Sequence, residues 1–135
     1  MSAVDAAKIW SLNYRVLLSV VATVETDLTG LGVDSKELFL LAEVDEHPSP
    51  AELAAALSMP KATVTVYLKR LEAAGFVRRE IDPTDLRRHR LLLTTAGRKA
   101  TTDGLALLAD AFDQRLSRLT ATQQKELKNM LEKIL

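Results

Sequence analysis

The feature that most constrains the fold of this chain is a pair of short helices in its middle third, whose ends are marked by proline and glycine residues. Ser49, Pro50 and Glu52 have the spacing of a capping box with proline in the first turn, which predicts a helix start. Pro60 opens a second helix, and Gly75 ends it. The expected helices are Pro50–Leu57 and Pro60–Ala74, joined by a tight turn. Helical spacing places Val64, Leu68, Leu71 and in part Tyr67 on the buried face of the second helix.

After this pair the sequence changes from helical to strand periodicity. Residues 76–82 (FVRREID) and 88–94 (RHRLLLT) predict two strands. The connection Asp82–Arg87 starts with the turn residues Asp-Pro-Thr, which predicts a hairpin. Two short helices followed by a hairpin have the order of a winged helix-turn-helix, in a mostly α fold.

Apolar residues at helical spacing predict further helices on both sides of this segment. We expect one domain, because 135 residues can bury a core without disulfides or metals. Residues 34–95 are expected to form the lobe that contains the helix pair and the hairpin, with residues 1–33 and 96–135 as flanking helices. Four further helices are expected, of which the first covers residues 5–28 and the third residues 96–119. The second is capped by Asp34 or Ser35 and ends near Glu46. The fourth is capped by Thr120, which forms a capping box with Gln123.

The formal net charge of zero hides an uneven distribution. Residues 1–60 carry three positive and nine negative side chains, residues 61–99 carry ten positive and four negative, and the remainder carries five of each. The predicted helix pair and hairpin therefore share a basic segment, which suits a nucleic-acid partner.

Several classes of function lack the residues they need. The chain has no cysteine and two histidines, so it offers little for a metal site, a cofactor or a catalytic triad, and we expect no enzyme. The apolar run Val16–Val24 is too short to span a membrane. Because the apolar face continues beyond this run, we expect a helix rather than a signal peptide, and a cytoplasmic protein without a membrane partner.

Residues 49–100 resemble the MarR-type (multiple-antibiotic-resistance regulator) winged-helix transcription factors. The resemblance covers about 50 residues in motif detail, and the flanking helices match in order and length only. Its motifs are Glu52-Leu53-Ala54; Thr63-Val64-Thr65 with Leu68, Leu71, Glu72 and Gly75; Phe76-Val77-Arg78-Arg79; Asp85-Leu86-Arg87; and Leu93-Thr94 with Gly97.

The resemblance implies a homodimer that binds a pseudo-palindromic site in double-stranded DNA. Residues 1–33 and 96–135 would be its dimerisation helices and residues 34–95 its DNA-binding lobe. Many members are repressors that a small ligand releases. By motif position, Arg87 is the wing-tip arginine and Asp85 the acid that orients nearby arginines. The expected DNA-binding residues are Lys61, Thr63, Thr65, Val66, Lys69, Arg70, Arg87 and Arg88.

Two residues depart from the family pattern, which often has a polar or basic residue where Val66 stands and another basic residue where Leu86 stands. Val66 cannot hydrogen-bond a base, but it can pack on a thymine methyl group, which indicates T-containing half-sites or weak sequence reading. Leu86 is an apolar residue at a predicted wing tip.

Each of these functional interpretations has a simpler structural alternative. The wing arginines can be outward residues of an ordinary strand pair, and the fold can serve as a protein-interaction module that does not bind DNA. Trp10 and Tyr14, one helical turn apart, can line a pocket for a small-molecule effector or can pack in an interface.

Overall fold

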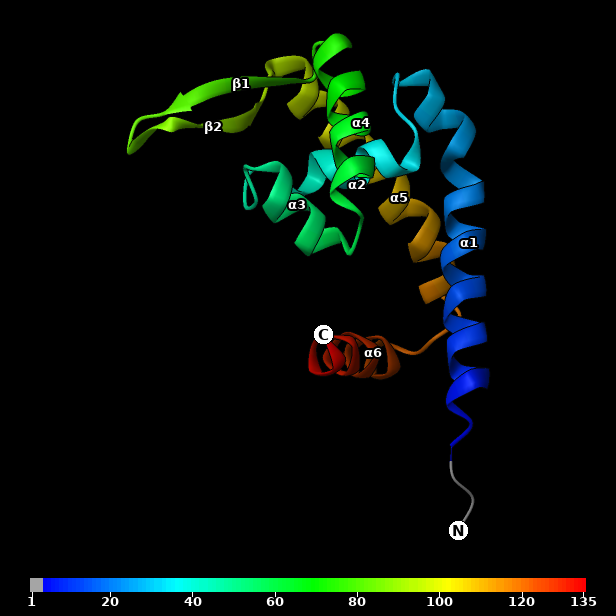
Figure 1. The fold of residues 1–135 in the computed structure, drawn as a ribbon. Helices are drawn as coiled ribbons and strands as arrows, with labels where there is room; N and C mark the ends of the chain where they lie inside the picture. Colours follow the sequence, from blue (N-terminus) through cyan, green and yellow to red (C-terminus); the bar gives the residue numbers. More distant parts are fainter. Residues whose placement is uncertain (1–3) are drawn as a thin grey trace. The chain divides into compact units, whose positions relative to one another are not determined.

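Six helices and one antiparallel strand pair make up residues 4–135, the part of the chain that the computed structural model describes (Figure 1). This order confirms the predicted mostly α, winged helix-turn-helix fold. The chain divides into two compact units, one formed by residues up to Val24 with Leu107–Leu135 and the other by Glu25–Ala106. The elements are α1 (Ala6–Gly30), α2 (Ser35–Glu43), α3 (Pro50–Leu57), α4 (Lys61–Ala73), β1 (Val77–Asp82), β2 (Asp85–Leu93), α5 (Thr95–Leu116) and α6 (Ala121–Ile134).

Two helices start with complete capping boxes. At α2 the cap is Asp34, whose carboxylate accepts from the Glu37 N–H at 2.8 Å while the Asp34 N–H donates to the Glu37 carboxylate at 3.1 Å. At α6 the Thr120 and Gln123 side chains make the same reciprocal pair, as the sequence predicts. These bonds satisfy N–H groups that a helix start leaves open.

The box predicted at α3 is only half formed. The Ser49 hydroxyl accepts from the Glu52 N–H at 3.2 Å, with Pro50 in the first turn. Within the described residues, the Glu52 side chain makes no return bond to the Ser49 N–H. Glu52 is exposed, and water competes for a carboxylate there, so little free energy favours the second bond.

A left-handed residue makes the turn between α3 and α4. Ser58 has φ 52° and ψ 43°, and the Met59 N–H donates to the Ala54 carbonyl at 3.0 Å. This conformation closes α3 within one residue. It allows Pro60 to start α4 at once, so the two helices pack as a helix-turn-helix.

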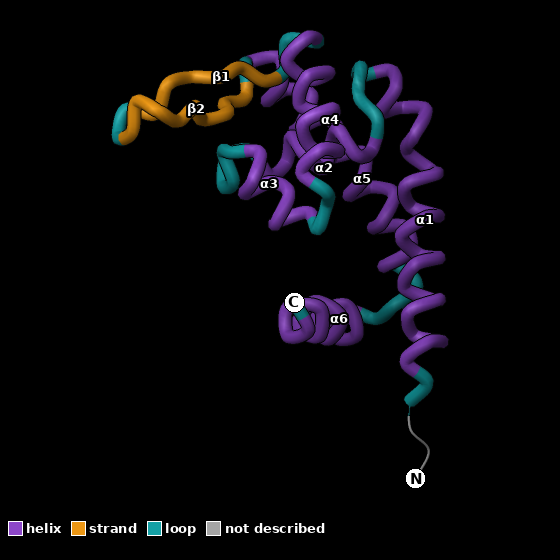
Figure 2. Tube along the Cα trace, viewed as in Figure 1, coloured by secondary structure: helices purple, strands orange, loops and turns teal. Residues whose placement is uncertain are grey.

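The hairpin differs from its prediction most at the start of the second strand, whereas its two outer ends are each one residue shorter than predicted. β2 begins at Asp85, three residues before the expected start, so the turn consists of Pro83 and Thr84 (teal tip in Figure 2). The register pairs Asp82 with Asp85 and Ile81 with His89, which leaves three β2 residues in a bulge. Period-2 patterning cannot predict such a bulge because the extra residues break the alternation.

The core of the unit Glu25–Ala106 lies between its helices and the base of the hairpin. Helix α4 contacts α2, α3 and β1. Helix α5 comes close to α2 at Gly104, where a Cβ would meet the Leu38 and Leu28 side chains. The largest fully buried side chains of this core are Leu28, Leu38, Leu40, Leu41, Leu53, Leu68, Leu71, Leu91, Val44 and Val64.

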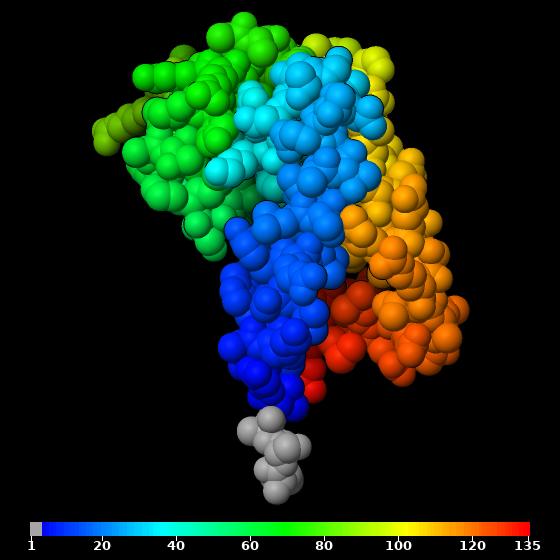
Figure 3. All heavy atoms as spheres, turned by 90° about the vertical axis from the view of Figure 1, so that its right-hand side faces the viewer, coloured from blue at the N-terminus to red at the C-terminus, as the bar shows by residue number. Residues whose placement is uncertain are grey.

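The other unit leaves many apolar side chains uncovered in a single chain. Figure 3 faces the N-terminal part of α1 (blue), which lies open on this side. None of the described side chains of α6 is buried. Within residues 4–135, no single helix is long and apolar enough to cross a membrane, and only the bent pair α1 and α2 passes on length and composition. The exposed apolar residues include Ile9, Leu12, Val16 and Leu17 on α1 and Met130, Leu131 and Ile134 on α6.

Candidate nucleic-acid interface

Helix α4 has one buried and one open face. Val64, Leu68 and Leu71 are fully buried, in agreement with the sequence prediction. Val66, 51% exposed, and the exposed Lys69 lie on the open side. Of the other predicted contacts on α4, Lys61 and Arg70 are exposed, and Thr63 and Thr65 are half-buried.

The start of α4 differs from the starts of α2, α3 and α6. Its cap residue is Pro60, and across the described residues no side chain bonds to this helix start. The Val64 N–H donates to the Pro60 carbonyl at 3.1 Å. The N–H groups that precede it in the first turn have no carbonyl partner within the helix. Such a start, with Lys61 beside it, favours an anion such as a phosphate.

Arg70 interacts with residues of its own unit, Tyr67 and Glu37. Its guanidinium lies 5.4 Å from the centre of the Tyr67 ring, a cation–π contact. Burial raises the pKa of Glu37, and the charge of Arg70 acts in the opposite direction. The sequence analysis missed both partners, although Tyr67 stands three residues before Arg70, a spacing at which helical side chains meet.

The tip of the hairpin is held by two carboxylates. Asp82 accepts from the Thr84 N–H at 2.9 Å and from its hydroxyl at 2.7 Å, and these bonds lower the pKa of Asp82. Asp85 accepts from the Arg87 N–H at 3.0 Å and lies 3.9 Å from the Arg88 guanidinium. Asp85 thus holds the backbone at Arg87 and lies near the exposed guanidinium of Arg88.

The remaining hairpin arginines differ in their surroundings. Arg78 forms an ion pair with Glu80, and Arg79 donates to Glu72 of α4 at 2.6 Å. Arg90 lowers the pKa of Asp82 through its charge. Arg79 therefore fastens the hairpin to α4, whereas the residues Asp85–Arg88 project at the far end (Figure 1).

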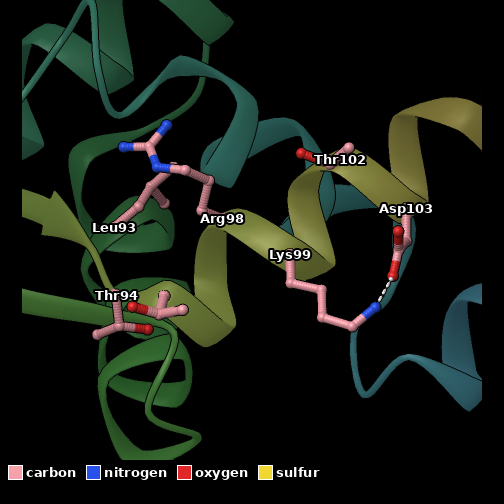
Figure 4. Close-up of a pocket in the computed structure, with 7 residues that line it drawn as sticks. Leu93, Thr94, Arg98, Lys99, Thr102 and Asp103 are labelled. Carbon is pink, nitrogen blue, oxygen red and sulfur yellow. Dashed lines mark hydrogen bonds and ion pairs between the residues drawn. The ribbon is translucent and has the colours of Figure 1, made fainter.

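A hollow of about 410 Å³ lies beside the first turns of α5 (Figure 4). Two cations line it, and each has a carboxylate partner: Lys99 donates to Asp103 at 2.7 Å, and Arg98 to Asp45 at 3.0 and 3.3 Å. These bonds raise the pKa of both cations. The charges of the hollow are thus already paired.

Two other groups of residues concern ligands. Glu43, Glu46 and His47 place one ligand atom each within 4.8 Å of one another at the surface, which is common for exposed acidic groups without a metal ion. Trp10 and Tyr14 stack with their ring centres 5.8 Å apart and are 64% and 46% exposed. They belong to the unit of residues up to Val24, whereas α4 and the hairpin belong to the other.

Comparisons with known proteins agree on one family. Residues 31–88 match the model of the MarR family. The chain is 35% identical over 136 residues to the HTH-type transcriptional repressor Rv2887 of Mycobacterium tuberculosis, an alignment that covers 99% of this chain and 98% of that protein.

Solved structures of this relative have the same fold. The crystal structure of Rv2887 in complex with DNA matches with a TM-score of 0.73 and 34% identity, over 92% of this chain and 94% of that chain. The complex of Rv2887 with p-aminosalicylic acid matches with a TM-score of 0.74 and 35% identity, over 92% and 95% of the two chains.

Proposed function

The chain belongs to the MarR family, and from this premise we propose that it is a homodimeric repressor that binds a pseudo-palindromic site in double-stranded DNA. The observation that carries the proposal is the pairing of an open α4 face with a projecting basic hairpin tip in one compact unit. The major groove is about 12 Å wide and admits one helix. A flanking hairpin can reach the minor groove, whose negative potential attracts arginine.

Each predicted residue of α4 has a role in this proposal. Lys61 and the uncapped helix start hold a phosphate, and Lys69 holds another. Thr63 and Thr65 can hydrogen-bond base edges or phosphates, and Val66 packs on a thymine methyl group. Arg70, fixed over Tyr67 in the free protein, contacts the backbone at the other end of α4.

The hairpin tip holds the second set of contacts. Arg87 is the residue we assign to the minor groove, and Arg88 to a phosphate beside it. Asp85 is a positioning residue, because its carboxylate accepts from the Arg87 N–H and so fixes the backbone that carries the arginine.

Dimerisation accounts for the apolar surface of the first and last helices. A single chain leaves Ile9, Leu12, Met130 and Ile134 largely exposed, and a second copy can cover such a surface by two-fold symmetry. Two copies of α4 then match half-sites one helical turn apart, roughly 34 Å. A repressor of this kind acts on chromosomal DNA, in the cytoplasm.

A small effector completes the proposal. Rv2887, the relative described above, has been crystallised with p-aminosalicylic acid, and Trp10 and Tyr14 are our candidate lining residues. Trp10 is the only tryptophan of the chain, so its fluorescence reports on that site alone. Salicylate should quench this fluorescence saturably and weaken DNA binding over the same concentration range; quenching without an effect on DNA binding would leave the effector role without support.

Selection of bound fragments from random duplex DNA, followed by sedimentation of the complex, tests the central proposal. The expected result is an enriched sequence with two dyad-related half-sites and two chains on each duplex. A dimer that enriches no sequence would favour the protein-interaction module instead.

A further inference from the structure

Leu86 stands at the tip of the hairpin with 79% of its surface exposed. A single exposed leucine is common on protein surfaces and requires no function by itself. The surroundings of Leu86 distinguish it from such a residue, because the backbone on both sides is fixed and the neighbouring side chains are cationic.

The backbone around Leu86 is held in place. Asp82 accepts hydrogen bonds from the N–H and hydroxyl of Thr84, and Asp85 accepts one from the N–H of Arg87. One carboxylate therefore fixes the backbone on each side of Leu86. The register pairs Asp82 with Asp85 and Ile81 with His89, which places Leu86 in the bulge between these pairs. A bulge re-aims the side chains that it carries.

Near the tip, the arginine side chains are open to a partner, whereas the carboxylates already accept hydrogen bonds. Arg87, Arg88 and Arg90 are exposed, whereas the carboxylates of Asp82 and Asp85 already accept hydrogen bonds from the turn. The tip is thus an apolar group with cations beside it. The minor groove of DNA has the complementary arrangement, since its sugar-lined walls stand between two rows of phosphates.

We propose that Leu86 enters the minor groove beside Arg87, packs against the sugars and discriminates against guanine there. The inference rests on the proposed function and adds a specificity-determining residue to it. Guanine places its 2-amino group in the minor groove, whereas an A·T pair has only acceptors there. A leucine side chain over that amino group would bury a donor without a partner, which costs free energy.

Inosine isolates this effect. An I·C pair lacks the 2-amino group but keeps the major-groove pattern of G·C, so placing G·C and then I·C at each A·T pair of a selected site in turn compares two pairs whose groove patterns differ only in the minor groove. The wild-type protein should bind about tenfold more tightly when inosine replaces guanine under the wing. Leu86→Ala should bring this ratio close to one and leave the salt dependence unchanged, because no charge is removed.

Ile81→Ala is the matched control. Ile81 is a second exposed apolar residue of the hairpin, 57% exposed, but it is paired in register with His89 and lies outside the bulge. It should keep the wild-type inosine ratio. Thermal unfolding of both variants should match that of the wild-type protein, because both side chains are exposed.

The outcomes separate the inference from the function on which it rests. A wild-type ratio of one at every substituted position, or a Leu86→Ala variant that keeps the wild-type ratio, overturns the role of Leu86 while DNA binding stands. If the wild-type protein binds no duplex in a salt-dependent way, the proposed function fails, and the inference fails with it.

Discussion

Gly97 packs directly on the backbone carbonyl of Phe76, so that a Cβ at position 97 would overlap that oxygen. Phe76 immediately precedes β1, and Gly97 lies in the first turn of α5. The Phe76 carbonyl also accepts from the Thr94 N–H at 3.1 Å, and the Thr94 hydroxyl accepts from the Gly97 N–H at 3.0 Å. The base of the hairpin and the start of α5 are therefore joined backbone to backbone.

Gly97→Ala should lower the free energy of unfolding by about 2 kcal/mol, because the added methyl group can fit only if backbone shifts. Urea unfolding measures the change. The control is Gly30→Ala, where a Cβ would meet no atom within 4 Å and φ is not positive. Equal stabilities for the two variants would contradict the close approach at Phe76.

Arg87→Ala should weaken binding to every duplex and reduce the salt dependence. A lost phosphate or groove cation lowers the slope of log affinity against log salt by about 0.9 for each of the two copies. A salt titration from low to physiological ionic strength measures it. Lys36→Ala, which removes an exposed cation of α2, is the control and should keep the wild-type slope. An unchanged slope for Arg87→Ala would remove this residue from the interface.

Val66→Ala should change the preference among half-sites while leaving the salt slope as it is. Replacing thymine by uracil removes the C5 methyl group and nothing else in the major groove. We expect uracil to weaken wild-type binding several-fold at the positions under α4, and the alanine variant to be insensitive to it. A wild-type protein indifferent to uracil throughout the selected site would disprove the methyl contact.

Met130→Asp should convert the dimer to a monomer or an aggregate and lower DNA affinity with it, because an uncompensated charge would be buried in the interface. Sedimentation at micromolar concentration measures the mass. Met130 is 56% exposed in the single chain, so its replacement leaves the core untouched. Lys128→Ala, on the same helix and paired with Glu132, is the control. A dimer that survives both Met130→Asp and deletion of residues 120–135 would contradict the role given to α6.

The hairpin turn should loosen in acid. Thr84 lowers the pKa of Asp82 below its ordinary value of 3.8, so the folded turn favours the ionised carboxylate. The contribution is complete above pH 3.8 and is lost as the pH falls through the lower folded value. The Thr84 amide resonance should titrate with a midpoint below 3.8, and Thr84→Ala should move the Asp82 midpoint upward. Identical midpoints in the two proteins would show that Thr84 does not hold Asp82.

Local sequence patterns were sufficient for the features that depend on neighbouring residues. The Thr120–Gln123 capping box and the buried positions Val64, Leu68 and Leu71 follow from spacing alone, and the structure confirms them. The single bond at Ser49 shows the limit, because whether Glu52 folds back depends on competition with water.

Features that depend on three-dimensional contacts were outside the reach of such patterns. The early start of β2 follows from how Asp82 and Asp85 fold the turn, and a bulge has no period-2 signature. The charge of Arg70 acts on Glu37 of α2, and no local pattern links two residues so far apart in the sequence. The DNA roles of the α4 and hairpin residues stay predictions.

The bare surface of α6 links the lifetime of this protein to its abundance. A helix of 14 residues is marginally stable in water without tertiary support, and every described side chain of α6 is at least partly open in one chain. Assembly stabilises the surface that it covers by an amount that rises with the logarithm of the partner's concentration. We therefore expect α6 to be cut by proteases more readily in dilute than in concentrated protein, so that the abundance of this protein sets how long its copies survive.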